Sequence, residues 1–396
     1  MIYSDFQDKK LSLLGLGTMR LPVIPDSNGK IDEAQVEEMV RIAMDKGVNY
    51  FDTAYPYHAG LSEPVIGRVL KKYPRESFYL ATKFPGHQYA DSYDPAKTFA
   101  HQLERCQVDY FDFYLLHNVC EKSMDTYFDE KWGIIDYFIE QKKQGKIRHL
   151  GFSTHARPET IKEILDKVGE HMEFCQIQLN YLDWSLQDAK AKYELLTERG
   201  IPVWVMEPLR GGKLANLPEA AAKKLGDADS AASAHELAFR YLAELPNVKV
   251  ILSGMSNIAQ MQDNADIFAE RKPLNEKHFE AMYSVAEGLK KSVPCTACRY
   301  CCDGCPAGLD IPLLLGIYND YSFEASVITS MAIEALPEDK RPASCIGCGA
   351  CESICPQGIE IPKIMGQFAD AMKGKPTWED ICRERNAAMQ KILKGE

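Results

Sequence analysis

The sequence lacks the long apolar runs and the basic excess that mark membrane and nucleic-acid-binding proteins. No run of 18 or more apolar residues occurs, which excludes a membrane-spanning helix of ordinary length. The first residues, MIYSDFQDKK, have acidic positions where a signal peptide needs a basic start, so we expect a cytoplasmic protein. Acidic residues outnumber basic ones by 57 to 46, and the net charge of −11 argues against nucleic acid as a partner.

A glycine-rich phosphate loop is also absent. Arg20 in GLGTMR stands where G-x-G-x-x-G requires its third glycine. RGGKL at 210–214 continues with Leu214, whereas a P-loop needs serine or threonine after its lysine. Both absences count against an open, doubly wound nucleotide-binding sheet. A Gly/Ser-rich linker is missing as well, so we expect the two domains that 396 residues suggest to dock against each other.

Short apolar runs alternate with amphipathic, helix-like stretches from residue 11 to about 268. The first pair reads LSLLGLGTM and DEAQVEEMVRIAMDKG, and eight such pairs occur in all. Repeated β-α units predict a parallel sheet covered by helices, and eight of them can close into a TIM barrel. We therefore expect an α/β protein with a (β/α)8 barrel over residues 1–285 and a small helical domain over residues 286–396.

Eight of the 13 cysteines form two copies of C-x2-C-x2-C-x3-C-P near the end of the chain. Three thiolates at this spacing can hold three corners of an iron–sulfur cube, and the fourth, before proline, commonly belongs to the other cube. Zinc sites and disulfides are the alternatives, but zinc is usually held by two C-x2-C pairs. The spacing therefore predicts two [4Fe–4S] clusters. The first has the ligands Cys295, Cys298, Cys301 and Cys355, and the second has Cys345, Cys348, Cys351 and Cys305.

These motifs resemble those of two-cluster ferredoxins, and the resemblance covers the last quarter of the chain. A G-[LI]-[DE]-I-P segment and a helix-like stretch follow each copy, at 312–336 and at 362–372, which predicts a helical ferredoxin-like domain. Cys302 could replace Cys305 as a ligand, but that would break the match between the copies. The other cysteines are scattered, as expected in a reducing, anaerobic cell. They are Cys106, Cys120, Cys175 and Cys382.

Four polar residues follow the expected strands at the edge where TIM barrels carry their chemistry: Asp52, Tyr57, Lys83 and His117. Each alone has an ordinary explanation, as a cap, a packing residue, a solvated charge or a structural histidine. Together they fit carbonyl reduction. A buried ammonium lowers the tyrosine pKa from about 10, provided that Asp52 keeps Lys83 charged. Tyr57 would then give a proton to a carbonyl oxygen that His117 orients.

With these residues in place, nearly the whole of the first 270 residues resembles the aldo-keto reductase family. GLGTMRLP, FDTAYPYHAGLSE, ATKF, LLH, GFS, QIQLNY and PLRGGKL follow the family's order, and the four residues above match its catalytic tetrad. The resemblance implies hydride transfer from NAD(P)H to a small-molecule carbonyl substrate. It also implies a nucleotide site at Ser153, Gln176, Met206, Ser253, Gly254, Gln260 and Asn264.

Three of these nucleotide positions depart from the family pattern. Met206 replaces a tyrosine that stacks on the nicotinamide ring, and methionine covers a ring less rigidly. Gly254 and Gln260 stand where lysine and arginine usually bind the 2′-phosphate of NADPH. Because a phosphate without a paired cation binds poorly, we expect NADH to be used at least as well as NADPH. Arg271 and Lys272 lie nearby and could supply the missing charge.

The segment after the fourth strand offers further pocket candidates, Asn118, Cys120 and Trp132, and His58 is a candidate for the pocket rim. Packing of the loop and the following helix is the alternative for the aromatic residues of this segment. An inert buried thiol is likewise the commoner state of a lone cysteine.

Three functions remain open at this point. Nicotinamide delivers two electrons as hydride, whereas each cluster transfers one. In the first function the barrel reduces a carbonyl with NAD(P)H, and the clusters hold the tail together or sense oxygen. In the second, the clusters feed electrons to a flavin or a substrate at the barrel mouth. In the third, which the intact tetrad disfavours, the protein is an electron carrier with an inactive barrel. A redox partner protein would belong to the second and third functions.

Overall fold

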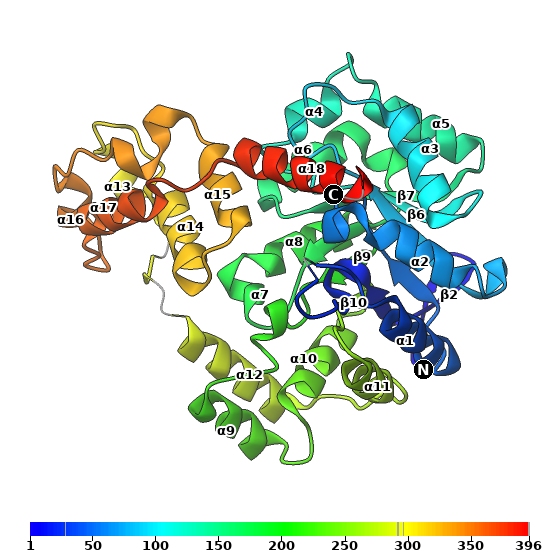
Figure 1. Cartoon of the computed structure of the whole chain (residues 1–396). Coiled ribbons are helices and arrows are strands. Elements are labelled where there is room, and N and C mark those ends of the chain that lie inside the picture. Colours follow the sequence, from blue (N-terminus) through cyan, green and yellow to red (C-terminus); the bar gives the residue numbers. More distant parts are fainter. Residues whose placement is uncertain (28, 291–292, 296, 395–396) are drawn as a thin grey trace. The chain divides into compact units, whose positions relative to one another are not determined.

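The structure, a computed structural model, describes residues 1–27, 29–290, 293–295 and 297–394 and contains two compact units (Figure 1). Unit 1 comprises Met1–Val285 and Arg385–Glu396, and unit 2 comprises Ala286–Glu384. The sequence interpretation assigned all of residues 286–396 to the second domain. The structure groups Arg385–Glu396 with unit 1 instead.

Unit 1 is a closed barrel of parallel strands, and the strand order β10-β3-β4-β5-β6-β7-β8-β9 confirms the predicted (β/α)8 fold. The strands are apolar and buried on both faces, as parallel strands are when helices cover them. Their bounds are β3 (Leu14–Gly17), β4 (Tyr50–Asp52), β5 (Tyr79–Phe84), β6 (Phe111–Leu116), β7 (Ile147–Thr154), β8 (Cys175–Gln178), β9 (Val203–Met206) and β10 (Val248–Ser253).

Helices surround these strands in Figure 1. Local signals set their starts: the Asp32 carboxylate accepts a hydrogen bond from the Gln35 N–H, and Pro95 and Pro158 occupy first turns. The helices before residue 290 are α1 (Glu33–Asp45), α2 (Ser62–Leu70), α3 (Pro95–Cys106), α4 (Met124–Phe128), α5 (Ile134–Lys143), α6 (Pro158–Val168), α7 (Asp183–Leu186), α8 (Ala189–Glu198), α9 (Glu219–Ala228), α10 (Ala234–Ala243), α11 (Ile258–Ile267) and α12 (Glu276–Leu289).

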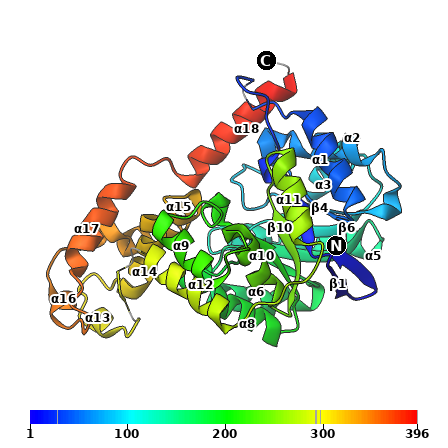
Figure 2. The same ribbon diagram turned by 90° about the horizontal axis from the view of Figure 1, so that it is seen from below.

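An antiparallel hairpin of β1 (Tyr3–Phe6) and β2 (Lys9–Ser12) precedes the barrel. The sequence interpretation treated LSLLGLGTM as a single strand, whereas the structure divides it between β2 and β3. Figure 2 shows β1 outside the ring of barrel strands. The Phe6 ring packs edge-on against Trp204 inside the barrel, with 5.1 Å between the ring centroids. Phe6 therefore helps to fill the barrel core at the end where the strands begin.

Unit 2 is helical and has two similar halves. The short helices α13 (Tyr300–Asp303) and α16 (Ala350–Ser353) lie within the cysteine motifs, and longer helices follow each motif. These are α14 (Ile311–Phe323) and α15 (Val327–Glu334) in the first half and α17 (Ile361–Met372) in the second. A shared apolar core joins the halves; it includes Leu309, Ile311, Leu314, Leu315, Ile359, Ile361, Met365 and Phe368.

The helix expected over residues 312–336 is interrupted. α14 ends at Phe323, and Ser326 begins α15 by accepting a hydrogen bond from the Thr329 N–H at 3.3 Å. Serine competes for helical backbone groups and is therefore common at such starts. The prediction of one continuous helix in this segment was wrong.

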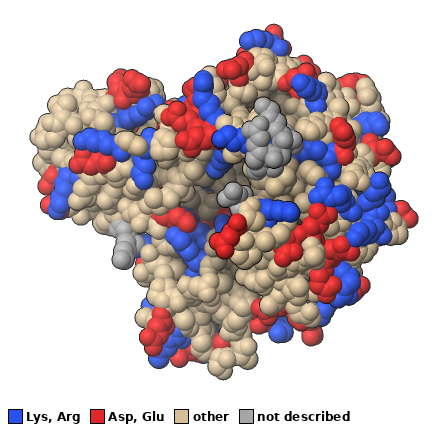
Figure 3. Space-filling view, in the orientation of Figure 1, with Lys and Arg blue, Asp and Glu red and all other residues tan. Residues whose placement is uncertain are grey.

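The last helix, α18 (Trp378–Lys394), agrees with the helix expected there. Its first residue is tied to unit 2, since the Trp378 N–H donates to the Glu334 carboxylate at 2.9 Å. Among the described residues no helix combines the length and apolar character needed to cross a membrane. On the face shown in Figure 3, acidic and basic side chains are interspersed, and neither sign forms a continuous patch.

Candidate active site and cluster centres

The structure brings the four expected catalytic residues together at one edge of the barrel. Asp52 ends β4, Lys83 is the fifth residue of β5, and His117 directly follows β6. Tyr57 begins a short 3-10 turn, Tyr57–Gly60, that follows β4. Because β4, β5 and β6 are neighbours in the parallel barrel, their carboxyl ends place these side chains beside one another.

Lys83 is the centre of this group. Its side chain is 0% exposed, and its ammonium donates to Asp52 Oδ1 at 2.6 Å and to the Thr53 carbonyl at 2.8 Å. A third, longer hydrogen bond joins Lys83 Nζ to the hydroxyl of Tyr57 at 3.4 Å. The buried cation thus connects a carboxylate to the phenol, which is the arrangement that the sequence interpretation anticipated.

The charges of this group follow from burial and contact. The Asp52 carboxylate and the Tyr57 hydroxyl raise the pKa of Lys83 although burial opposes this, so Lys83 stays protonated. The sequence interpretation expected Lys83 to bring the pKa of Tyr57 below its ordinary value. The structure contradicts this: burial of the phenolate outweighs the charge of Lys83, and the pKa of Tyr57 is raised. Tyr57 is therefore protonated over the whole physiological range.

His117 meets Tyr57 edge to face, with 5.9 Å between the ring centroids. Burial lowers the pKa of His117 well below its usual value, and the charge of Lys83 acts in the same direction. The ring is therefore neutral at pH 7. Its Nδ1 atom is buried and has no hydrogen-bond partner among the described residues. A buried polar atom without a partner beside a tyrosine hydroxyl is suited to contact a ligand oxygen.

Two of the expected nucleotide residues lie side by side on β7 and β8. Ser153 and Gln176 are paired in the register of these strands, and both side chains are nearly fully buried. The Oε1 atom of Gln176 is buried without a partner among the described residues, so it can accept a hydrogen bond from an amide such as nicotinamide carboxamide. Ser153 Oγ already accepts a hydrogen bond from the Asn118 N–H at 2.8 Å.

The other expected nucleotide residues surround the ends of β9 and β10. Met206 is the last residue of β9 and is partly exposed. Ser253 ends β10 and accepts a hydrogen bond from the Asn264 amide at 3.1 Å. Gln260, in the first turn of α11, accepts one from the Ser256 N–H at 2.8 Å.

Gly254 lies against the side chain of Arg20. A Cβ atom added at Gly254 would lie 3.2 Å from Cγ and Cδ of Arg20, so the arginine occupies the space that a larger residue would need. Arg20 also pairs loosely with Glu207 at 3.5 Å. Arg271, which the sequence suggested as a substitute cation, pairs instead with Glu244, directly after α10, at 3.6 Å, and Lys272 pairs with Glu236 of α10 at 3.1 Å.

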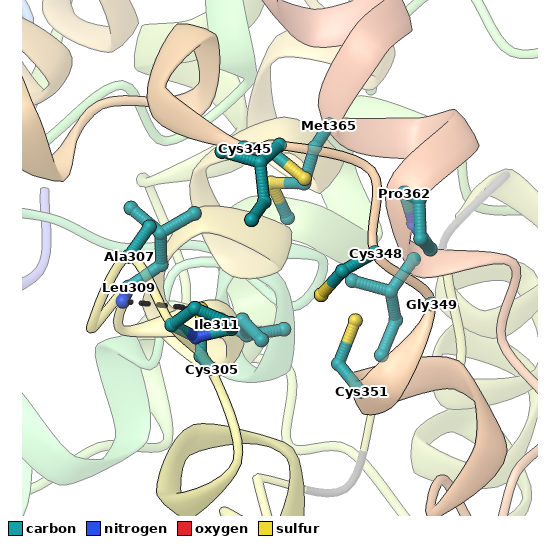
Figure 4. A pocket seen from close by; sticks show the side chains of 13 residues that line it. Cys305, Ala307, Leu309, Ile311, Cys345, Cys348, Gly349, Cys351, Pro362 and Met365 are labelled. Carbon is teal, nitrogen blue, oxygen red and sulfur yellow. Dashed lines mark hydrogen bonds between the residues drawn. The ribbon is translucent and has the colours of Figure 1, made fainter.

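The cysteines of the two motifs line two separate hollows in unit 2. Cys305 from the first motif joins Cys345, Cys348 and Cys351 of the second around one hollow, which Figure 4 shows. Cys355 of the second motif joins the first motif around the other hollow, together with Cys295, Cys298 and Cys301. Each hollow thus has the crossed set of thiols that the spacing predicted.

The hollows suit a group larger than a single ion. Within the part of the chain that the structure describes, no three His, Cys, Asp or Glu side chains converge closely enough to hold one metal ion. Apolar residues complete the lining of the hollow in Figure 4, including Leu309, Ile311 and Met365. A thiol quartet around an apolar hollow fits an iron–sulfur cube, whereas structural zinc requires four donors at about 2.0–2.3 Å.

Two family models match this chain, one over the barrel and one over the cysteine motifs. The model of the aldo/keto reductase family matches residues 13–287. The chain belongs to the aldo/keto reductase family. A model of the 4Fe-4S dicluster domain matches residues 294–360, so this aldo/keto reductase carries a dicluster domain after its barrel. Both matches confirm the resemblances found in the sequence.

Several proteins of known structure or name are similar to this aldo/keto reductase. L-galactose dehydrogenase of Arabidopsis thaliana is 29% identical over 288 residues, which cover 67% of this chain and 86% of that protein. The NADH-specific methylglyoxal reductase of Escherichia coli is 28% identical over 227 residues, covering 52% and 66%. The holo form of an aldo-keto reductase from Bacillus halodurans aligns with a TM-score of 0.59 at 27% identity, covering 72% of this chain and 96% of that one.

Other candidates near the aldo/keto reductase site have structural roles. His58 Nε2 accepts a hydrogen bond from the Leu21 N–H at 3.0 Å. Asn118 is buried and its Oδ1 accepts from the His155 N–H at 3.2 Å, while Cys120 is a buried thiol whose pKa is raised by burial. Trp132 packs edge-on against Tyr93, with 5.3 Å between the ring centroids. These contacts agree with the packing alternative for the segment after β6, and a role in the pocket stays a prediction.

Sequence reasoning missed three residues close to the aldo/keto reductase site. Arg20 was read only as the residue that spoils a glycine motif, although its place after the first barrel strand puts it on the catalytic edge. His87 follows β5, and His155 follows β7, at the same edge. The available signal was position alone, since polar residues directly after barrel strands lie where TIM barrels bind their ligands.

Proposed function

We propose that the barrel reduces a small-molecule carbonyl compound with hydride from NADH. The observation that carries this proposal is the buried Lys83 ammonium, held by Asp52 and hydrogen-bonded to Tyr57 at the carboxyl edge of the barrel. The membership of the aldo/keto reductase family supports the reaction class. Oxidation of NADH on addition of an aldehyde, followed anaerobically at 340 nm as an ordinary absorbance assay, tests the proposal directly.

In this proposal each side chain has one task. Tyr57 donates its proton to the carbonyl oxygen as general acid, and its raised pKa keeps that proton in place until the oxygen becomes basic. Lys83 stabilises the phenolate that remains, because its charge lies 3.4 Å from the tyrosine oxygen. The neutral His117 orients the same carbonyl oxygen through a ring nitrogen.

The nucleotide, when bound, supplies hydride to the carbonyl carbon. The buried and unpartnered Oε1 of Gln176 supports a role in holding the nicotinamide carboxamide, with Ser153 beside it. Met206 at the end of β9 would cover the nicotinamide ring, and Asn264 with Ser253 would contact the adenosine end.

We expect NADH to bind at least as tightly as NADPH. The two positions that would hold a 2′-phosphate are a glycine and a glutamine, and Arg271 and Lys272 are paired with the carboxylates of Glu244 and Glu236. The name of the Escherichia coli relative, an NADH-specific reductase, agrees with this preference. Titrations of both nucleotides at equal salt measure the ratio. NADPH binding about tenfold tighter than NADH would contradict the prediction, since tenfold corresponds to a distinct phosphate contact of about 1.4 kcal/mol.

The rate of reduction should show no histidine titration. The pKa of His117 lies well below its usual value, and those of His87 and His155 are lowered to about 3 by burial. These rings therefore stay neutral as the pH falls through the ordinary histidine pKa of about 6.5. A profile of kcat against pH is expected to be flat through that value and to fall only in the alkaline range, above the ordinary tyrosine pKa of about 10, because burial raises the pKa of Tyr57. A fall in kcat centred near pH 6.5 would show that one of the three histidines titrates.

We further propose that the crossed cysteine quartets hold two [4Fe–4S] clusters. The thiol hollows of unit 2 and the match to the dicluster domain support this assignment. In the carbonyl reductase the clusters would stabilise the domain or respond to oxygen. A second function, in which they feed electrons to a bound flavin, is favoured by the one-electron chemistry of the clusters themselves. Flavin released from anaerobically purified protein would support that second function.

A further inference from the structure

A buried polar network lies behind the tetrad, where α2 and α3 pack against each other. Glu63 of α2 is its centre and is 0% exposed. Its Oε1 atom accepts hydrogen bonds from Thr82 Oγ1 at 2.6 Å and from Gln102 Nε2 at 2.7 Å. Its Oε2 atom lies 3.2 Å from Nε of Arg105, as an ion pair without the alignment of a hydrogen bond. The proposed proton and hydride transfers use none of these four residues, although charged groups are costly to bury.

A glycine on α2 brings the two helices into close contact at this network. A Cβ atom added at Gly67 would lie 2.6 Å from the backbone carbonyl oxygen of Arg105 and 2.6 Å from the carbonyl carbon of Cys106. A larger residue would therefore push α3 away from α2 and separate Arg105 from Glu63. The place of Arg105 is thus set by backbone packing as well as by its charge.

The network reaches the tetrad through two backbone carbonyl groups. Gln102 Nε2 donates to the carbonyl oxygen of Lys83 at 3.1 Å. Arg105 donates to the carbonyl oxygen of Gly60, the last residue of the turn that Tyr57 begins. The segments that carry the proton donor and its ammonium partner are therefore both attached to one buried carboxylate, through two side chains of α3.

The turn that carries Tyr57 has a backbone that needs support. His58 and Ala59 both have a φ of 52°, in the left-handed region that residues with a Cβ atom rarely adopt. Such residues persist where the surrounding contacts fix them. The His58 ring supports the turn by accepting a hydrogen bond from a backbone N–H, and Arg105 supports its end at Gly60. Without the second contact the turn could relax, and the Tyr57 hydroxyl would lose its fixed place beside the buried ammonium.

We propose that Arg105 is a positioning residue for Tyr57. It holds the Gly60 carbonyl, with its charge balanced by Glu63, and so keeps the tyrosine hydroxyl in contact with the Lys83 ammonium. This inference deepens the proposed carbonyl reduction and rests on it. A guanidinium group presents its N–H donors in a planar fork, so it can serve a carboxylate and a carbonyl oxygen at once. A lysine ammonium keeps the charge but is a point charge on a flexible stem, and it does not reproduce this geometry.

Arg105→Lys tests this role in the intact holoenzyme. We expect kcat for an aldehyde to fall by at least about tenfold, with KM and NADH affinity changed by less than about twofold, because only the proton donor is displaced. The deciding measurement combines the variant with Tyr57→Phe. Once the hydroxyl is gone, Arg105→Lys should lower kcat by less than about twofold, because residues that act as a unit are not additive. No loss in the wild-type background, or the same loss in both backgrounds, would overturn the proposal.

Arg75→Lys is the matched control. Arg75 likewise pairs with a buried carboxylate, Asp112 at 2.5 Å, and donates to a backbone carbonyl, that of Phe78 at 3.1 Å. Asp112 is the second residue of β6, so this pair lies at the end of the barrel opposite to the tetrad. Arg75→Lys should therefore lower the melting temperature but leave kcat unchanged. An equal fall of kcat in the two variants would mean that the loss of any buried arginine explains the effect, and the positioning role would fail.

A second variant covers the case in which Arg105→Lys does not fold. Glu63→Gln combined with Arg105→Met removes both charges of the pair, so no unpaired charge stays buried. It should show the same loss of kcat, and that loss should again disappear in the Tyr57→Phe background. A loss that persists there would count against the proposal as it does for Arg105→Lys.

Amide hydrogen exchange separates this inference from the proposed function. Exchange in residues 57–61 should be faster in Arg105→Lys than in wild type and unchanged in Arg75→Lys, whether or not an aldehyde is reduced. If exchange is faster but no aldehyde is reduced, Arg105 holds the turn and the proposed reaction fails. If aldehydes are reduced but exchange in the turn is unchanged, the reaction stands and the positioning role fails.

Discussion

Replacing Tyr57 with phenylalanine is expected to lower kcat for carbonyl reduction by at least ~10²-fold, the usual scale of general acid catalysis. The substitution removes one oxygen and leaves the aromatic ring that packs edge-on against His117. Steady-state kinetics with one aldehyde and saturating NADH measure the effect, and a separate NADH titration shows whether the nucleotide site is intact.

The size of this effect follows from the surroundings of the hydroxyl. The Tyr57 hydroxyl accepts a hydrogen bond from the buried Lys83 ammonium, and this contact stabilises the phenolate that forms when the proton leaves. The ring also lies 4.9 Å from Lys83 Nζ, so phenylalanine keeps the cation–π contact while losing proton transfer. We therefore expect a change in kcat and not in the fold.

Tyr55→Phe is the matched control. Tyr55 is two residues earlier, is half-buried, and its hydroxyl bonds to His101 Nδ1 at 3.2 Å, away from the tetrad. It also has a cation over its ring, since the Arg105 guanidinium lies 4.7 Å from the centroid. Its loss should leave kcat nearly unchanged, because this hydrogen bond touches no reacting atom and contributes only about 1 kcal/mol or less to stability. Unchanged turnover in Tyr57→Phe would remove Tyr57 as the proton donor.

The barrel could be predicted because its signal is repeated along the chain. Each strand is a short buried run and each helix an amphipathic one, so an error in one element does not change the fold. The hairpin of β1 and β2 was missed because strands of four residues around a tight turn are too short to show the alternation of apolar and polar residues that identifies a strand. The break between α14 and α15 was also missed. The segments on both sides of Ser326 are apolar and helix-like, so the sequence reads as one helix although Ser326 caps the start of a second one.

The identity of the site residues was accessible from position, but their electrostatics were not. Residues at or just after the carboxyl ends of barrel strands lie on the catalytic edge whatever the details of packing, which is why Asp52, Lys83 and His117 were found. The direction of the pKa shift of Tyr57 depends on how completely the phenol is buried, and burial is a property of the folded molecule.

Cysteine substitutions in pairs are expected to show which thiols share a cluster. Wild-type protein purified anaerobically should contain about eight iron atoms per chain, and Cys305→Ser about four. In the structure Cys305 faces the hollow lined by Cys345, Cys348 and Cys351, and its sulfur accepts a hydrogen bond from the Leu309 N–H at 3.5 Å (Figure 4). Loss of this ligand should therefore affect the cluster of the second motif, although Cys305 belongs to the first.

Double variants make the result decisive. Cys305→Ser combined with Cys345→Ser removes two ligands of one crossed quartet, so about four iron atoms should remain. Cys305→Ser combined with Cys295→Ser removes one ligand from each quartet, so iron should fall toward zero. If each motif bound its own cluster, the two double variants would give the opposite results. Electron paramagnetic resonance of the reduced protein counts the remaining clusters independently of iron analysis.

Cys302→Ser is the control within the same motif. Cys302 lies next to Cys301 and packs against the core of unit 2, but it lines neither hollow. Its loss should leave about eight iron atoms and an unchanged spectrum. If Cys302→Ser loses one cluster while Cys305→Ser keeps both, the ligand is Cys302, and the first motif departs from the spacing of the second. Circular dichroism of every variant shows whether lost iron reflects a lost ligand or a domain that no longer folds.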